Sequence, residues 1–220
     1  KISLETNFCQ RLTKGVNMKL FDGLGPNPQV VRMFLAELGM EIETVKVDIM
    51  AGENRQEGHL NRNPMGQLPT LELDDGSYLA EITAICEYLD DLKGSTELIG
   101  TNPEERAVTR MWTRRISLNI CEAMTTAFRG AEGHQFFKDR LRTFPESADE
   151  FKAQAQESLS LLDVQMDGKE FICGKNFTLA DIMLFCFLNF GSTVGQEINP
   201  ETKNILSWFN KVEKRPSASA

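Results

Sequence analysis

The segment "NPMGQLPTLEL", residues 63–73, places a proline at the start of a run that otherwise has the pattern of a buried strand. Proline cannot donate a hydrogen bond to a sheet, although at the first residue of a strand the missing N–H costs little. A second interpretation is that Leu68, just before Pro69, keeps its own N–H and C=O free, so that something other than the protein can pair with them. From the segment alone, both hypotheses stay open.

Thiol and imidazole groups are the next candidates for chemistry. The cysteines are odd in number, widely spaced and without a C-x-x-C pair, which suits a reducing cytoplasm; they are Cys9, Cys86, Cys121, Cys173 and Cys186. We expect them to be free, buried thiols that pack as small apolar residues. His59 and His134 have no metal-like partner spacing, so we predict two solvated histidines and no bound metal.

The composition of the chain argues against some classes of binding partner. With 220 residues, 41% hydrophobic and 25% charged, the chain is typical of a soluble globular protein of one domain or two small ones. The net charge of −8 argues against a nucleic-acid partner, since such binding needs a basic patch. No apolar run is long enough to cross a bilayer, so we expect no membrane partner. Residues 1–17 show no signal-peptide core and are predicted to be an extension outside the fold, with Met18 as an alternative start.

The elements that position the candidate residues begin with alternating strand and helix signals from residue 18 to 94. The pattern predicts a strand at 18–23, a helix from residue 27 to a stop at Gly39, and a strand at 42–49. A hairpin follows at 68–81, with its turn at Asp75-Gly76, and then a helix over 81–92. This order predicts a small mixed sheet, made of two parallel strands joined by a helix and a hairpin, with helices covering it.

Residues 103–220, after a linker at 95–102, have helical periodicity throughout. We predict helices over 104–128 and 148–166 and an almost wholly apolar, central helix at 177–190, with Thr178 and Asp181 spaced as a capping box. The first of these helices carries a stripe predicted to pack in the core: Val108, Met111, Trp112, Ile116, Ile120, Met124 and Phe128. The predicted fold class is therefore α/β plus all-α.

An ordered set of motifs resembles the cytosolic glutathione S-transferase family, of bacterial type. It comprises "NPMGQLPTLELDDGSYLAEITAICEYL", then "FTLADIML" in an all-helical half, then "WFNKVEKRPS", and it covers residues 18–216. The resemblance implies a thioredoxin-like, glutathione-binding domain at 18–94 and a helical bundle at 103–220 for the second substrate and for dimerisation. It also implies a cytoplasmic homodimer with a role in detoxification and glutathione as its co-substrate.

In that family the residue before the strand proline pairs through its backbone with the cysteinyl unit of glutathione, and the proline is cis. These positions correspond to Leu68 and Pro69, so the resemblance favours a short open edge to which a tripeptide adds like an extra strand. Gln67 falls where a Lys or Gln often contacts the glycyl end of glutathione. The alternative for Gln67 is a solvated loop amide.

Glu81 matches the family's acid that faces the γ-glutamyl ammonium, and its alternative is a first-turn acid that interacts with the helix dipole. The next residue departs from the family pattern, because Ile82 stands where a Ser usually holds the γ-glutamyl carboxylate. The free N–H groups of the helix still attract a carboxylate, and Thr83 offers a substitute hydroxyl. We therefore expect Ile82 to belong to the glutathione-binding site and to contribute less to binding than the family's Ser does.

The position of the residue that activates the thiol departs further from the family pattern. Glutathione transferases activate the thiol with a Tyr, Ser or Cys after the first strand, and in "DGLGPNPQVVR" the usual Ser position falls on Gly25. Asn27 remains, and its plain interpretation is an N-cap with Pro28 at the first helical position. The functional interpretation is that the Asn27 amide, or nearby backbone N–H groups, donates to the glutathione sulfur. Asn cannot act as a base, so the thiol proton leaves to water.

The second, apolar substrate needs a pocket in the helical half. Met111 and Trp112, with Phe128, are the candidates for its lining, and packing between helices is their alternative role. The implied function is conjugation of glutathione to an electrophilic apolar substrate, or reduction of a disulfide or peroxide with it. The competing hypothesis, which Gly25 and Ile82 support, is a non-catalytic glutathione-binding or scaffold protein with the same fold.

Overall fold

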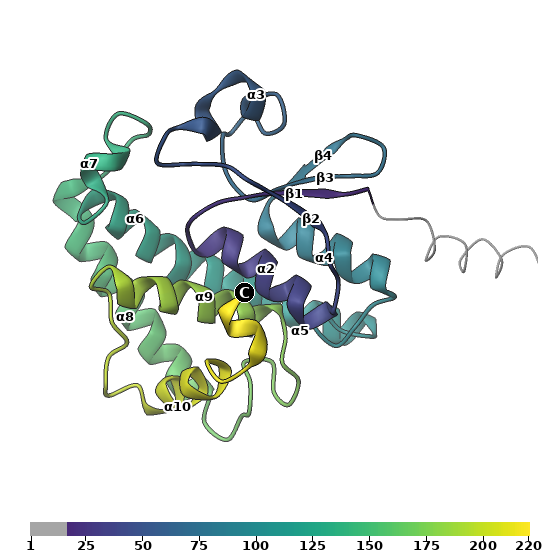
Figure 1. Cartoon of the computed structure of the whole chain (residues 1–220). Coiled ribbons are helices and arrows are strands. Elements are labelled where there is room, and N and C mark those ends of the chain that lie inside the picture. Colours follow the sequence, from purple (N-terminus) through teal and green to yellow (C-terminus); the bar gives the residue numbers. More distant parts are fainter. Residues whose placement is uncertain (1–16) are drawn as a thin grey trace, which may run out of the picture.

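The computed structural model describes residues 17–220. Figure 1 shows a sheet with two long helices on the side facing a larger helical half and a short helix on the opposite side. Residues 1–16, almost all of the predicted extension at 1–17, lie outside the described residues, and Cys9 lies there too. The predicted fold class is confirmed: a thioredoxin-like domain precedes a helical bundle. No helix between residues 17 and 220 is long and apolar enough to span a membrane.

The first half is built around a four-stranded sheet of order β2-β1-β3-β4. Strand β1 runs parallel to β2 and antiparallel to β3, and β3 and β4 form the predicted hairpin. The elements are β1 (Lys19–Asp22), α2 (Pro26–Leu38), β2 (Glu43–Lys46), η1 (Glu53–Arg55), α3 (Glu57–Leu60), β3 (Thr70–Glu72), β4 (Tyr78–Ala80) and α4 (Ile82–Lys93).

Strand β2 is shorter than the predicted strand at 42–49 because the chain turns at Asp48. The Asp48 carboxylate accepts hydrogen bonds from the backbone N–H groups of Met50 and Ala51, at 2.8 and 3.0 Å. An Asp side chain that bonds backbone groups two and three residues on replaces sheet pairing with a turn. The residues after this turn reach the mouth of the cavity described below.

The second half contains α5 (Pro103–Ile116), a π-helical segment η2 (Ser117–Cys121), α6 (Glu122–Gly130), α7 (His134–Phe137), η3 (Pro145–Ser147), α8 (Ala148–Gln165), α9 (Leu179–Thr193), α10 (Lys203–Val212) and η4 (Pro216–Ser219). The single helix predicted over 104–128 is thus interrupted by a π turn. On α5 the buried residues are Thr109, Trp112, Thr113 and Ile116. The prediction that Val108 and Met111 are core residues is wrong, because they are 39% and 40% exposed and two threonines take that face instead.

Helix α9 is the predicted central helix, and residues 179–188 of it are all buried. The capping box of Thr178 and Asp181 is confirmed. The fully buried Asp181 carboxylate also accepts from the backbone N–H groups of Ile172 and Thr178, at 3.0 and 2.9 Å, and from Trp208 Nε1–H at 2.9 Å. Burial raises the pKa of Asp181 from 3.8 to about 6 despite these donors. One carboxylate therefore joins the start of α9 to α10.

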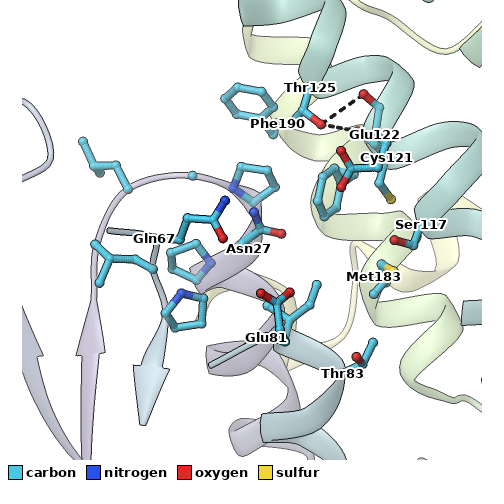
Figure 2. A pocket seen from close by; sticks show the side chains of 18 of the residues that line it. Asn27, Gln67, Glu81, Thr83, Ser117, Cys121, Glu122, Thr125, Met183 and Phe190 are labelled. Atoms are coloured by element: carbon cyan, nitrogen blue, oxygen red, sulfur yellow. Dashed lines mark hydrogen bonds between the residues drawn. The ribbon is translucent and has the colours of Figure 1, made fainter. Parts of the chain in front are cut away.

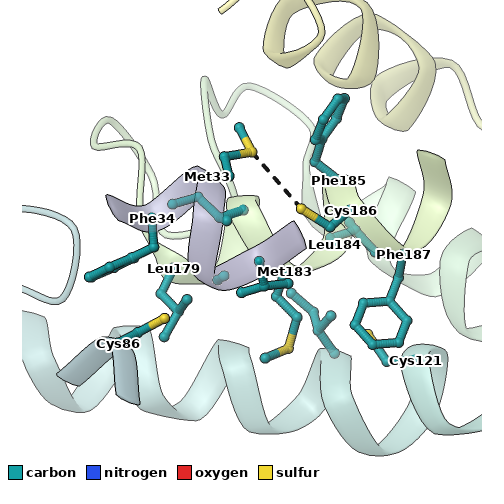
Figure 3. Close-up of a cluster of buried hydrophobic side chains, with 14 of the residues drawn as sticks. Met33, Phe34, Cys86, Cys121, Leu179, Met183, Leu184, Phe185, Cys186 and Phe187 are labelled. Carbon is teal, nitrogen blue, oxygen red and sulfur yellow. Dashed lines mark hydrogen bonds between the residues drawn. The ribbon is translucent and has the colours of Figure 1, made fainter. Parts of the chain in front are cut away.

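The two halves share one core, in which α2 packs against α9. Figure 3 shows Met33 of α2 facing Cys186 of α9, with a 4.0 Å hydrogen bond from the Cys186 thiol to the Met33 sulfur. At the surface Arg215 makes a bidentate pair with the carboxylate of Glu37, at 2.9 and 2.7 Å. These contacts hold the helical half against the sheet domain. They therefore also fix the relative position of the two walls of the cavity described below.

Candidate active site

A cavity of about 990 Å³ lies between the two halves. Its first wall comes from the β1–α2 loop, the loops at 49–55 and 63–69, and the start of α4; its second wall comes from α5, η2, α6, α7 and α9. Figure 2 shows Asn27, Gln67 and Glu81 on the first wall facing Ser117, Cys121 and Thr125 on the second. The volume is at the upper end of the usual range for small-molecule pockets, about 300–1,000 Å³.

Leu68 and Pro69 lie at the cavity with the expected cis peptide bond between them. Among residues 17–220, neither the N–H nor the C=O of Leu68 makes a hydrogen bond. The expectation of an open edge at this strand needs correction, because β3 lies between β1 and β4 and is paired on both sides over residues 70–72. The free backbone groups of Leu68 lie just beyond the end of that ladder, where an extended ligand can pair with them.

The Gln67 carbonyl anchors this segment through three side chains. His59 Nε2 lies 3.0 Å from the Gln67 oxygen, Asn63 Nδ2 donates at 3.0 Å, and Thr70 Oγ1 donates at 3.3 Å. The prediction of a solvated His59 is wrong, since its side chain is 3% exposed. Because a carbonyl only accepts, Nε2 carries the proton. These hydrogen bonds direct the Gln67 carbonyl toward the protein interior and hold Leu68 at the cavity wall.

The second histidine, His134, lies away from this segment. It is half-buried, and its Nδ1 lies 3.1 Å from Thr143 Oγ1.

Glu81 occupies the N-cap position of α4 in an unusual backbone conformation, with φ at 72° and ψ at 120°. Residues other than glycine adopt positive φ only where the surrounding structure imposes it, and such strain is concentrated at functional sites. The Glu81 side chain is exposed and does not cap the helix. Its carboxylate is therefore available to a cation in the cavity, and Glu81 lies at the N-cap rather than in the first turn.

The N-terminus of α4 adds anion-binding capacity next to Glu81. The first helical hydrogen bond runs from the Ile85 N–H to the Glu81 C=O, at 2.9 Å, so the N–H groups of the three residues between them have no partner within the helix. Ile82 and Thr83 are half-buried and line the cavity. Free N–H groups and the helix dipole together favour a carboxylate at this point. Glu81 and this helix end can thus receive an ammonium and a carboxylate side by side.

The N-cap of helix α2 is Gly25 and its first helical residue is Pro26, two residues before the predicted Asn27 and Pro28. The expectation that Asn27 is the N-cap is therefore wrong. Gly25 has φ at 114° and ψ at 171°, a region almost exclusive to glycine. Asn27 lies in the first turn, half-buried, and lines the cavity.

The two prolines around Asn27 have a chemical consequence. Pro26 and Pro28 lack a backbone N–H, so Asn27 carries the sole N–H donor among the first three residues of α2. Its side-chain amide makes no hydrogen bond to any other residue in the part of the chain that the structure describes, and Figure 2 shows it directed into the cavity beside the exposed Gln67. Asn27 can therefore donate twice to an anion at the positive end of the α2 dipole.

The second wall is formed by different residues from those predicted. Neither Met111 nor Trp112 lines the cavity, which uses Thr109, Thr113 and Ser117 from the same stretch of chain. Their replacement follows from the burial of Trp112 against the core and the exposure of Met111. Phe128, the third candidate, does line the cavity.

The cysteines do not supply a nucleophile. Cys86, Cys121 and Cys186 are buried and Cys173 is half-buried, and all four are free thiols, as expected for the described cysteines. Cys121 borders the cavity, but burial raises the pKa of its thiol well above the ordinary value. A protonated thiol is a poor nucleophile. Between residues 17 and 220 there is also no group of three or more His, Cys, Asp or Glu side chains arranged to hold a metal.

Sequence reasoning missed the anchor formed by His59 and Asn63, and it missed Arg129, Phe136 and Phe137 on the second wall. Arg129 belongs to the end of α6. Phe136 and Phe137 belong to α7, a four-residue helix that is too short to give a clear periodic signal in the sequence. Arg129 does follow Thr125 by four residues, a spacing that places both on one helix face.

Comparison with known families and proteins gives a consistent result. The family model described as "Glutathione S-transferase, N-terminal domain" matches residues 16–91, and "Glutathione S-transferase, C-terminal domain" matches residues 119–216. Glutathione S-transferase 2 of Saccharomyces cerevisiae is 30% identical over 195 residues, which are 88% of this chain and 84% of the yeast protein.

Two further similarities bear on function. A solved structure of a glutathione S-transferase domain-containing protein from Marinobacter aquaeolei VT8 is 34% identical, with a TM-score of 0.85 over 90% of this chain and 98% of that chain. A probable elongation factor 1-gamma 1 of Arabidopsis thaliana is 26% identical over 185 residues, which are 82% of this chain and 42% of that protein.

Proposed function

This chain belongs to the glutathione S-transferase family, and from that premise we propose that it is an enzyme that joins the sulfur of glutathione to an electrophilic, largely apolar substrate. The observation that carries the proposal is the convergence, in one cavity, of the unpaired Leu68 backbone, the Glu81 carboxylate with the α4 N-terminus, and the Asn27 donors. These groups match the parts of a tripeptide thiol.

In the proposed complex, the cysteinyl unit of glutathione pairs with the N–H and C=O of Leu68, next to cis-Pro69. The γ-glutamyl ammonium faces Glu81, and its carboxylate accepts from the free N–H groups after Glu81, with Ile82 adding only its backbone. Gln67 contacts the glycyl end. This pose directs the sulfur along the first wall toward Asn27.

The chemistry then needs a thiolate. The Asn27 amide and backbone N–H donate to the sulfur, and the α2 dipole lowers the thiol pKa, so the proton leaves to solvent. The thiolate attacks the electrophilic atom of the second substrate, a C–S bond forms, and the leaving group departs with its electron pair. With a disulfide or peroxide, two glutathione thiols instead supply the two electrons and end as oxidised glutathione.

A panel of glutathione-dependent assays tests the proposed function: 1-chloro-2,4-dinitrobenzene, a low-molecular-weight disulfide and cumene hydroperoxide. We expect turnover that saturates with glutathione for at least one of them. Glutathione binding with no turnover of any would favour the alternative, a scaffold or binding protein, which the similarity to an elongation factor 1-gamma makes a specific second candidate.

A Glu81→Gln variant is expected to weaken glutathione binding about tenfold, because a charge-assisted hydrogen bond is worth roughly 1.5–3 kcal/mol. Titration calorimetry with glutathione and with glutaryl-cysteinyl-glycine, which lacks the ammonium, isolates the contact. The variant and the unchanged protein are expected to bind the second ligand alike. The matched control is Glu57→Gln, an exposed residue off the cavity. An equal loss for both ligands would contradict the assignment of Glu81.

We further propose a cytoplasmic homodimer that acts in detoxification, as the family resemblance implies. The exposed apolar side chains on the face of α5 away from the cavity support an interface there; they are Val108, Met111 and, just beyond α5, Leu118. Sedimentation equilibrium measures the oligomeric state directly, and a monomer at micromolar concentration would contradict this part of the proposal.

A further inference from the structure

Four half-buried phenylalanines line one end of the cavity: Phe128 of α6, Phe136 and Phe137 of α7, and Phe190 of α9. Their rings meet edge to face, with centroid separations of 5.9 Å for Phe128 and Phe137, 5.0 Å for Phe128 and Phe190, and 4.8 Å for Phe136 and Phe137. Figure 2 shows Phe190 beside Thr125, at the end of the cavity away from Glu81 and Thr83. This end therefore offers aromatic surface to whatever lies beyond the glutathione sulfur.

Arg129 brings a positive charge to the same end. It lines the cavity, is half-buried, and has its guanidinium carbon 5.7 Å from the centre of the Phe137 ring. Within residues 17–220 no carboxylate lies within 4.0 Å of it. Burial lowers the pKa of the Arg129 guanidinium from its ordinary value. A partly desolvated cation without a counter-ion is costly unless a ligand supplies one.

The acids nearest in the chain do not neutralise Arg129. Glu132 is paired with Lys152, at 2.5 Å. Glu122 interacts with Arg129 only at longer range, since the two residues lie seven positions apart on α6, about 10 Å along the helix axis. Glu122 is exposed, and Figure 2 shows it nearer the middle of the second wall, below Thr125. The aromatic end of the cavity is thus locally cationic.

We propose that the second substrate is an aromatic electrophile that carries a carboxylate on the side of the ring opposite its reacting carbon, and that Arg129 selects for it. This inference rests on the proposed transferase function and names the substrate class of that site. The ring lies among the four phenylalanines, where edge-to-face contacts favour it. The planar guanidinium binds the carboxylate with two parallel hydrogen bonds. The reacting carbon then faces the glutathione sulfur near Asn27.

A suitable probe is 4-chloro-3-nitrobenzoate, in which the carboxylate lies opposite the reacting carbon. The glutathione thiolate forms a C–S bond at the carbon that bears chlorine, the C–Cl bond breaks, and chloride leaves with the electron pair; the thiol proton has already gone to solvent. The uncharged partner is 4-chloro-3-nitrobenzamide, which has the same shape and leaving group. Intrinsic differences in reactivity cancel when each variant is compared with the unchanged protein on the same probe.

The test compares kcat/KM for both probes in the unchanged protein and in Arg129→Gln. We expect the value for the carboxylate to fall about tenfold or more, as for loss of a charge-assisted hydrogen bond, and the value for the amide to change less than about twofold. Arg129→Lys keeps the charge and is expected to recover part of the loss. The matched control is Arg142→Gln, because Arg142 also lies over a phenyl ring, 5.4 Å from Phe144, but off the cavity.

Equal losses on both probes would overturn the inference and leave the transferase function standing, since Arg129 would then only support the wall through Phe137. If the unchanged protein turns over neither probe, the transferase proposal fails for this class of reaction. The inference is then decided by calorimetric binding of the two finished conjugates, S-(4-carboxy-2-nitrophenyl)glutathione and its carboxamide. Tighter binding of the carboxylate that disappears in Arg129→Gln supports it, and equal affinities overturn it.

Discussion

An Asp181→Ala variant is expected to lose about 3 kcal/mol or more of its free energy of unfolding at pH 7. The substitution leaves three buried donors without an acceptor: the N–H groups of Ile172 and Thr178 and the indole N–H of Trp208. Each unsatisfied buried donor costs roughly 1–3 kcal/mol, and release of a buried carboxylate offsets part of the sum. Urea unfolding monitored by circular dichroism measures the difference.

The pH dependence of this loss is a second readout. Because burial raises the pKa of Asp181 from 3.8 to about 6, the folded protein holds the Asp181 proton more tightly than the unfolded chain does. The stability that Asp181 contributes is therefore greatest at low pH and declines as the pH rises to about 6. We expect a larger loss at pH 5 than at pH 7. The control is Asp149→Ala, an exposed aspartate in the first turn of α8, which is expected to change stability by less than about 0.5 kcal/mol. A loss this small in Asp181→Ala would contradict the buried network.

An Asn27→Ala variant is expected to lower kcat/KM for the preferred electrophile about 100-fold at pH 7. This is the size of effect seen when one hydrogen-bond donor to a catalytic anion is removed, and here the anion is the glutathione thiolate. The backbone N–H of residue 27 and the α2 dipole remain, so some thiolate stabilisation persists. A 100-fold loss corresponds to a rise of about 2 units in the pKa of the bound thiol. The rate of the variant is therefore expected to recover as the pH is raised.

That recovery separates a role at the sulfur from a structural role, because a distorted α2 would lower the rate equally at every pH. Asn61→Ala is the matched control, since Asn61 is exposed and off the cavity. An unchanged pH–rate profile for Asn27→Ala would remove Asn27 from the mechanism, and it would leave the assignment of the enzyme class standing.

The mixed sheet with its hairpin and the central helix could be predicted because local signals there agree with tertiary packing. Asp75-Gly76 forces a turn between β3 and β4, and the apolar composition of α9 leaves it no exposed face. The helix predicted over 104–128 differs in detail, because a π turn at 117–121 interrupts it and helical periodicity does not reveal such a turn.

Residues that line the cavity could be predicted where they belong to one motif, as for Leu68, Pro69 and Glu81. The site could not be predicted where separate segments meet. The segment around His59 is typical of the surface, yet His59 is buried and lies against the Gln67 carbonyl, which comes from a separate loop. Arg129 and α7 face the site only because α2 packs on α9 and brings the two walls together.

The most direct test of the central claim is a calorimetric titration with glutathione at pH 7 in two buffers of different ionisation enthalpy, which gives the affinity and the number of protons released. We expect binding with release of a substantial fraction of one proton, because the Asn27 donors and the α2 dipole hold the sulfur as a thiolate without a Tyr, Ser or Cys. Binding without proton release would contradict thiol activation at this site. No binding at millimolar glutathione would contradict the proposed site itself.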